Sequence, residues 1–320
     1  MNVKLASVSE TEPKGSKRSL MRKISNQKMF LAFLLPGILF FAVFSYLPLY
    51  GLLGAFQIYN PIDGFFGSDW VGLNNFRELF QMQKFHDVFM NTLLIGGIML
   101  VFGFPAPIIL ALMINEVVGT KFKRMVQSVS YLPHFISWVI GAGLFYNMLA
   151  ADGPLNELMI KLHVLKEPIY FFNEPGYFYF IAVVSSIWKE VGWGSILYLA
   201  ALTAINPSLY ESAEIDGAGK WKQIRYITIP GMMPMIILLF VLAVSNILNV
   251  SFEQIWTLQN AVNQEVSDIL DTYVFSILLS GSSRDYSMGI AVGLFKTVIG
   301  LTLFLITNYL MKRSGYGSLI

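Results

Sequence analysis

The sequence predicts an all-α, polytopic membrane protein with six transmembrane helices, and three observations support this prediction. Hydrophobic residues make up 55% of the 320 residues and only 13% are charged, which is about half the roughly 25% of a soluble domain. Basic residues are unevenly distributed between the segments that separate the apolar ones. A helix needs about 20 mainly apolar residues to cross the hydrocarbon. Six windows are long enough: 30–54, 88–115, 126–149, 177–204, 231–251 and 286–311.

The first window follows a basic tail, residues 1–29, and opens the transmembrane domain, residues 30–320. It is too long for the core of a signal peptide and no small-residue cleavage site follows it, so we expect it to remain as a span. The second window contains Pro105 and Pro107, and Pro133–His134 lies near the start of the third. Because proline removes a backbone donor, each position predicts a kink or a break.

The basic residues predict the orientation of the spans. Fifteen of the 22 Lys and Arg lie in the tail, in segments 116–125 and 205–230, or at the C-terminus. The alternate segments 55–87, 151–176 and 252–285 hold only five basic residues, against 13 acidic ones. Because basic segments tend to stay in the cytoplasm, we expect both termini and the 205–230 segment to be cytoplasmic.

The three outer segments are longer than simple turns and contain Trp70, Trp256 and many Phe and Tyr. Two interpretations stay open. These segments are an aromatic belt at the membrane interface, with short helices lying in it, or they are a docking surface for an external partner.

A polar stretch at residues 206–230, which we call the 206–230 loop, interrupts the apolar pattern before the fifth window. Asn206 followed by proline is typical of a helix start. Gly217 offers a left-handed stop after the first short helix. Trp221 to Ile229 is typical of a second short helix, and Pro230 opens the next span. We therefore expect two short helices joined by a turn that protrudes from the membrane.

The loop also contains the letters GAGK at Gly217–Lys220. A phosphate-binding Walker A motif needs glycine five residues before its last glycine, and Ser or Thr after the lysine. Glu214 and Trp221 stand at those positions, so no ATP site is predicted. No catalytic residue or metal site is predicted either, because the chain lacks Cys, its three His fall in different segments and no metal-ligand spacing is present. A net charge of +2 argues against a nucleic-acid partner.

The 206–230 loop resembles the cytoplasmic loop of permease subunits of ABC importers, which has the form E-A-A-x-x-x-G followed by I-x-L-P. The extended form at residues 210–218 is similar to the carbohydrate branch of these permeases, and so are residues 91–96 and 186–205. Residues 130–140, SYLPHFISWVI, resemble the LplB-type subgroup, which takes up oligo- and polysaccharides and includes alginate importers. The resemblance covers roughly residues 30 to 311.

The resemblance implies a MetI-like type I importer fold in a bacterial cell membrane. It implies four partners: a second homologous permease, a cytoplasmic ATPase dimer that carries ATP and Mg, an external solute-binding protein and a carbohydrate. It also implies that the 206–230 loop is a coupling helix seated on the ATPase. The matching positions are Glu211, Ser212, Ala213, Asp216, Gly217, Ile227 and Pro230. Ser212 and Ile229 depart mildly from the family pattern.

A translocation path for sugars needs polar or aromatic groups within the spans. Ionisable residues there are costly, roughly 2.5–3.5 kcal/mol on insertion scales, and usually face a cavity or a partner. An ion pair with another helix explains the charged candidates equally well, and packing or interhelical hydrogen bonding explains the others. Lys296 either snorkels or pairs. The path candidates are Trp188, Lys189, Glu190, Trp193, Asn246 and Asn249.

Two other classes of function lack support in the sequence. A membrane enzyme would need a constellation of His and carboxylates, which the sequence does not show. A gradient-driven secondary transporter or channel would typically show an internal repeat, and none is clear between residues 30–150 and 177–311. Dependence of uptake on an added ATPase distinguishes the importer permease from both alternatives.

Overall fold

The computed structural model describes residues 27–281 and 283–313, so most of the predicted basic tail lies outside the described residues. The chain divides into two compact units, Met1–Leu53 and Gly54–Ile320. The first unit contains α2 (Lys28–Phe41) and the π-helical segment η1 (Ala42–Tyr46), and the 3-10 segment η2 (Leu47–Phe56) continues from it. Its apolar run is long enough to cross a membrane.

The described residues contain five helices that are long and apolar enough to span a membrane, and a sixth span if one bent pair is counted. This agrees with the predicted all-α fold of six spans. The five helices are Ala32–Phe56, Gln83–Glu116, Pro175–Thr203, Lys220–Ser245 and Arg284–Arg313.

The third window is not one straight helix. Thr120–Phe135 and Trp138–Met148 meet at an angle of 104°. Proline at position 133 opens a 3-10 turn, Ile136 is extended, and the Ser137 side chain then accepts a hydrogen bond from the Ile140 N–H at the start of a new helix. The kink expected here is therefore a full break.

The second span behaves differently at its prolines. It stays continuous through α5 (Gln83–Ile98), the π-helical segment η3 (Met99–Gly103) and α6 (Pro105–Glu116). The N–H of Phe104 bonds to the carbonyl of Met99, one residue further back than in an α-helix (3.2 Å). The wider turn accommodates the proline without breaking the helix.

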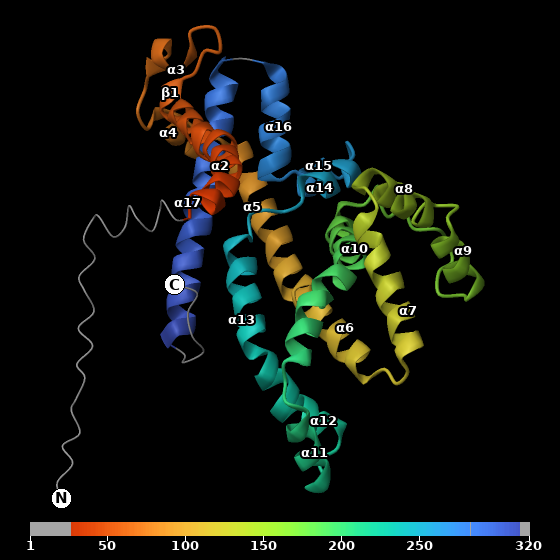
Figure 1. The fold of residues 1–320 in the computed structure, drawn as a ribbon. Helices are drawn as coiled ribbons and strands as arrows, with labels where there is room; N and C mark the ends of the chain where they lie inside the picture. Colours follow the sequence, from red (N-terminus) through yellow and green to blue (C-terminus); the bar gives the residue numbers. More distant parts are fainter. Residues whose placement is uncertain (1–26, 282, 314–320) are drawn as a thin grey trace, which may run out of the picture. The chain divides into compact units, whose positions relative to one another are not determined.

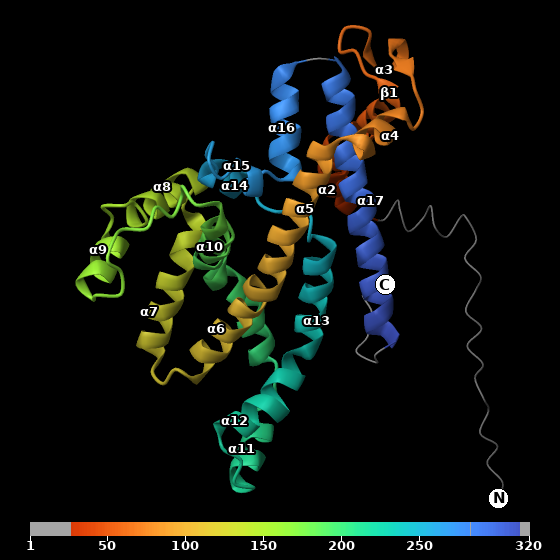
Figure 2. The ribbon, with the colours of Figure 1, turned by 180° about the vertical axis from the view of Figure 1, so that it is seen from behind.

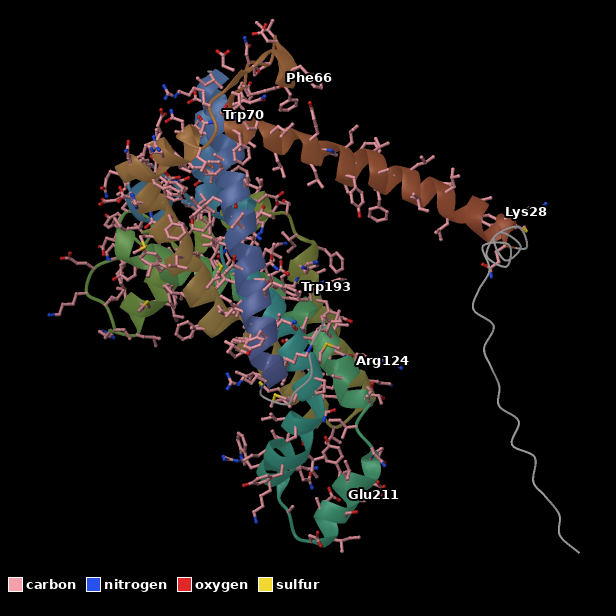
Figure 3. The ribbon with its side chains drawn as sticks, turned by 90° about the vertical axis from the view of Figure 1, so that its left-hand side faces the viewer. Lys28, Phe66, Trp70, Arg124, Trp193 and Glu211 are labelled. Atoms are coloured by element: carbon pink, nitrogen blue, oxygen red, sulfur yellow. The ribbon has the colours of Figure 1, made fainter. Side chains whose placement is uncertain are left out.

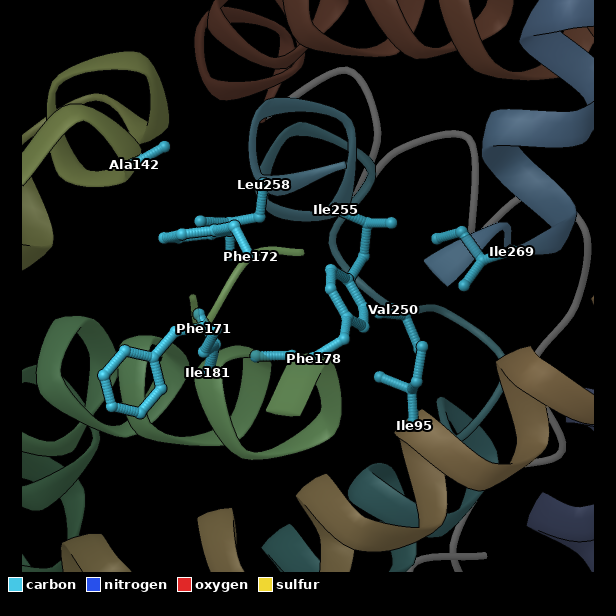
Figure 4. Packing of buried hydrophobic residues seen from close by; sticks show 11 residues of the cluster. Ile95, Ala142, Phe171, Phe172, Phe178, Ile181, Val250, Ile255, Leu258 and Ile269 are labelled. Carbon is cyan, nitrogen blue, oxygen red and sulfur yellow. The ribbon is translucent and has the colours of Figure 1, made fainter. Parts of the chain in front are cut away.

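The unit Gly54–Ile320 is built around α10 (Pro175–Thr203), which packs against α6, α7 (Thr120–Tyr131) and α13 (Ile229–Ser245). Gly192 permits a close approach to α7, because a Cβ there would lie 1.9 Å from the Ser130 carbonyl oxygen. Figure 4 shows the largest apolar cluster, in which Phe178 of α10 lies beside Ile255 and Ile95. The remaining helices are α3 (Gly64–Gly67), α4 (Asn74–Gln81), α8 (Trp138–Met148), α9 (Pro154–Lys161), α11 (Pro207–Ile215), α12 (Lys220–Gln223), α14 (Phe252–Leu258), α15 (Gln264–Ser267), α16 (Leu270–Ser280) and α17 (Ser283–Arg313).

Strand structure among the described residues is limited to one antiparallel pair, β1 (Gln57–Ile58) and β2 (Asp69–Trp70). The three predicted outer segments contain short helices, among them α4, α9 and α14. Within this unit, α11 and α12 lie at one end, and the C-terminal end of α16 and the start of α17 lie at the other (Figures 1 and 2). The α6–α7 connection lies toward the same end as α11, as expected for two segments predicted to share one side of the membrane.

Candidate functional site

The 206–230 loop is folded by local capping. The Asn206 side chain accepts a hydrogen bond from the Ser208 N–H (3.1 Å), which starts α11. Gly217 ends it with a φ of 75°. The N–H groups of Gly217 and Ala218 bond back to the carbonyls of Glu214 (3.0 Å) and Ala213 (2.8 Å). These are the two bonds of a Schellman motif, so the predicted helix start and left-handed stop are both present.

The second half of the loop is continuous with the next span, in contrast to the separate short helix that we expected. α12 runs through the π-helical segment η5 (Ile224–Thr228) into α13. Proline at position 230 does not separate them, because the wider π-helical turn just before it, in which the Ile229 N–H bonds to the Ile224 carbonyl, accommodates the proline ring. α12, η5 and α13 therefore form one continuous helix, Lys220–Ser245.

Buried polar side chains brace α11 against this continuous helix. The exposed fractions of Gln223 and Thr228 are only 3% and 2%. Gln223 donates to the Ala218 carbonyl (3.2 Å), and the hydroxyls of Tyr210 and Thr228 lie 3.0 Å apart. Because buried polar groups that lose a partner are costly, these contacts hold the two arms of the loop in one geometry.

The outer surface of the loop is open. Glu211 is exposed and has no hydrogen bond or ion pair within the described part of the chain, whereas Glu214 faces Lys220 (3.6 Å). Figure 3 shows Glu211 at one end of the unit, well separated in space from Trp193 on α10. Ile215 and Trp221 are 87% and 84% exposed. Of the predicted coupling residues, Ala213 and Ile227 are half-buried and the other five are exposed.

Four of the six path candidates gather at the break in the third span. Lys189 is buried, and its ammonium donates to the carbonyls of Pro133 (3.3 Å), His134 (2.8 Å) and Ile136. It also lies 5.5 Å from the centre of the Trp138 ring. The Pro133 carbonyl also accepts from the Ile136 N–H (3.1 Å), so the ammonium mainly serves the carbonyls of His134 and Ile136, which end the helical hydrogen bonding at the break.

Glu190 points to the same break. Its carboxylate lies 2.8 Å from His134 Nδ1, and it does not pair with the adjacent Lys189, because the side chains of adjacent helical residues do not face each other. Trp193 stacks on the His134 ring with centroids 4.6 Å apart. Trp188 packs edge-on against Phe145. These contacts are those of a helix junction.

The other two path candidates, Asn246 and Asn249, line a separate polar pocket of about 440 Å³. We call it the polar pocket. Its lining residues come from the end of α13 and the residues just after it, the start of α16 and the middle of α17. Lys296 of α17 pairs with Asp271 of α16, with both oxygens 2.7 Å from the ammonium, which decides between snorkelling and pairing. Its lining residues are Ser245, Asn246, Asn249, Asp271, Gly293, Lys296, Thr297, Gly300, Leu301 and Phe304.

The structure therefore separates the path candidates into two groups, and it adds one residue that sequence reasoning missed. Asp271 lies outside the apolar windows, so its charge raised no signal. The charge of Lys296 within a span was the only signal in the sequence that a carboxylate partner lies nearby. No group of three His, Cys, Asp or Glu suited to a metal ion occurs in the described ranges.

Comparison with known proteins identifies the family. Residues 103–316 match the model for "Binding-protein-dependent transport system inner membrane component". The chain is 40% identical over 296 residues to Protein LplB of Bacillus subtilis (strain 168), with 92% of each protein covered. It is 41% identical over 303 residues to the polygalacturonan/rhamnogalacturonan transport system permease protein YteP of the same organism, covering 94% of this chain and 93% of YteP.

Two solved structures have the same fold. One is a bacterial ABC transporter involved in the import of the acidic polysaccharide alginate, with a TM-score of 0.82, 40% identity, and coverage of 92% of this chain and 98% of that chain. The other is a bacterial alginate ABC transporter in complex with an alginate pentasaccharide-bound periplasmic protein, with a TM-score of 0.84, 39% identity, and coverage of 94% and 99%. The chain therefore belongs to the family of binding-protein-dependent transport system inner membrane components, the permease subunits of ABC importers, which have no ATPase of their own.

Proposed function

We propose that this permease and a second, homologous permease form the translocation path of a bacterial importer for oligo- or polysaccharides. An external solute-binding protein delivers the sugar. ATP and Mg act on a separate ATPase dimer in the cytoplasm, where both termini of this chain also lie. The 206–230 loop docks on that ATPase through Glu211, Ser212, Ala213, Asp216, Gly217, Ile227 and Pro230.

The construction of the 206–230 loop is the observation that carries this proposal. A solvated loop needs no buried polar brace, yet Gln223 and Thr228 are nearly inaccessible and hold its two arms together. It also exposes Ile215 and Trp221 at its surface, where a soluble tip would be polar. A rigid element with open apolar groups and an unpaired carboxylate at Glu211 suits a protein partner.

Continuity of α12 with α13 supports a role in transmission. Closure of an ATPase dimer on ATP would displace the loop, and α13 would move with it as one helix. Since α13 ends at the polar pocket, this movement reaches Asn246 and Asn249 directly. Alternating access is then an equilibrium between two arrangements that nucleotide and sugar bias by their differing affinities.

A carbohydrate cargo is supported by the relatives and by the chemistry of the polar pocket. YteP is named for polygalacturonan and rhamnogalacturonan, and the solved structures import alginate. The polar pocket offers amides, hydroxyls and the ring of Phe304, which suit hydrogen bonding and stacking with sugars. We therefore assign Asn246 and Asn249 to the path. Trp188, Lys189, Glu190 and Trp193 belong to the junction beside it.

Reconstitution tests the proposal against a gradient-driven transporter. The two permeases are placed in liposomes with or without the ATPase and the sugar-loaded binding protein, and uptake of a labelled oligosaccharide is measured. We expect uptake only when ATP, ATPase and binding protein are all present. Uptake by this chain alone, driven by a proton or sodium gradient, would overturn the proposal.

A further inference from the structure

Lys296 lies near the middle of α17, at a depth where a charge is costly and rarely kept without use. Its side chain is only 11% exposed, and what is exposed opens on the polar pocket. The partner Asp271 comes from the first turn of α16, 25 residues earlier. Among the described residues that line the polar pocket, these two carry the only charges.

The ion pair with Asp271 does not use all the hydrogen-bond donors of the Lys296 ammonium. An ammonium has three N–H donors, and the two contacts to Asp271, each 2.7 Å, are the only hydrogen bonds that Lys296 makes within the described part of the chain. At least one donor is therefore free toward the polar pocket. Asp271 is more open than its partner, with 34% of its side chain exposed.

The arrangement allows exchange of one carboxylate for another. Asp271 can give up the ammonium at modest cost, because its carboxylate lies at a helix N-terminus and keeps contact with water. Lys296 cannot leave, because its side chain is nearly buried. Around it, Asn246 and Asn249 place amide groups for sugar hydroxyls, Phe304 adds an aromatic ring, and a Cβ at Gly293 would meet no atom within 4 Å. A volume of about 440 Å³ lies within the range of roughly 300–1,000 Å³ of ligand pockets.

We infer that Lys296 recognises the carboxylate of an acidic sugar residue, and that Asp271 holds the ammonium when no sugar is present. This inference rests on the proposed function and names the cargo as a saccharide that contains hexuronate. The carboxylate takes the free donor of Lys296 first and then displaces one oxygen of Asp271. A neutral sugar has no group that can make this exchange.

The test compares two sugars that differ only in charge. One probe is tetragalacturonate, and the other is the same tetrasaccharide with its carboxyl groups reduced to alcohols. Binding of each to the complete transporter in nanodiscs is measured by saturation-transfer NMR, and uptake of both is measured in liposomes. We expect the parental transporter to bind the acidic probe at least about tenfold more tightly, since hydrogen bonds between charged groups are the stronger class.

Three variants separate recognition from a structural ion pair. Lys296→Met should abolish the preference for the acidic probe. Asp271→Asn should keep or increase it, because the ammonium loses its competitor. The double variant, which is also electrically balanced, should behave like Lys296→Met.

Loss of binding of both probes in each single variant, with recovery in the double variant, would show a structural ion pair and overturn the inference. Equal uptake of both probes by the parental transporter would also overturn it, while the proposed function would stand. Uptake of neither saccharide would instead refute the proposed function.

Discussion

Replacement of Gly217 by valine tests the coupling role of the 206–230 loop at a residue whose backbone has a left-handed conformation. Gly217 has a φ of 75°, a conformation that costs an L-residue roughly 1–2 kcal/mol and a β-branched residue more. A Cβ at this position would meet no atom within 4 Å. The penalty is therefore conformational and not steric, and it falls on the loop alone.

This strain should lower the affinity of the 206–230 loop for the ATPase. If valine keeps the left-handed turn, the loop stores the strain. If it does not, the bonds from Gly217 and Ala218 to Glu214 and Ala213 are lost and α11 swings away from α12. Either way the docking-competent loop becomes less favourable by about 1–2 kcal/mol, which corresponds to a roughly 5- to 30-fold weaker association with the ATPase.

Gly219→Val is the matched control, two residues away in the same loop. Gly219 has an extended backbone, with φ −69° and ψ 167°, and open space at its Cβ, so valine fits there without strain. We expect both variants to reach the membrane at the parental level. ATPase co-purification over a titration, sugar-stimulated ATP hydrolysis and uptake should all fall for Gly217→Val only. Equal behaviour of the two variants in all three measurements would refute the reasoning.

Three further predictions concern charge and orientation. Cysteine at Val262, which is 53% exposed in an outer segment, should react with an impermeant reagent in intact cells, whereas cysteine at Ser7 should not; labelling at Ser7 would reverse the orientation. Lys189→Met should lower the melting temperature of the purified protein, because the carbonyls of His134 and Ile136 lose their donor and each buried unsatisfied acceptor costs roughly 1–3 kcal/mol; unchanged melting with altered uptake would favour a role in the path. Glu211→Gln should weaken ATPase binding by roughly 2–5 kcal/mol if its carboxylate meets a buried basic group. Glu214→Gln should have a smaller effect, because the Glu214 carboxylate already faces Lys220. Similar losses of binding for both variants would contradict a specific contact at Glu211.

Features that depend only on residues close together in the sequence were predictable. The number of spans follows from the length of each apolar run, because a helix that satisfies its own backbone needs no partner to cross a membrane. The start at Asn206 and the stop at Gly217 follow from side chains and backbone angles within one turn. The distribution of Lys and Arg also depends only on individual segments, and the orientation that it indicates stays a prediction.

The break in the third span was only partly predictable. Proline at position 133 indicates a disturbed helix, but the same residue type leaves the second span continuous at position 105. The difference lies in the surroundings. Lys189 supplies donors to the carbonyls that the break exposes, and this contact joins residues more than 50 positions apart. Hydropathy alone cannot distinguish a bend of 104° from a modest kink.

By itself, the sequence determined that this is a membrane permease with six spans and a capped loop between the fourth and fifth, because those properties are local. Only the tertiary structure decided which polar residues meet. Lys189 lies among carbonyls at a junction, whereas Lys296 faces Asp271 in the polar pocket, although both are single lysines within apolar helices. The physical reason is that lipid-facing and protein-facing helix surfaces are similarly apolar, so periodicity does not reveal neighbours. Packing alone places α13, α16 and α17 around one cavity.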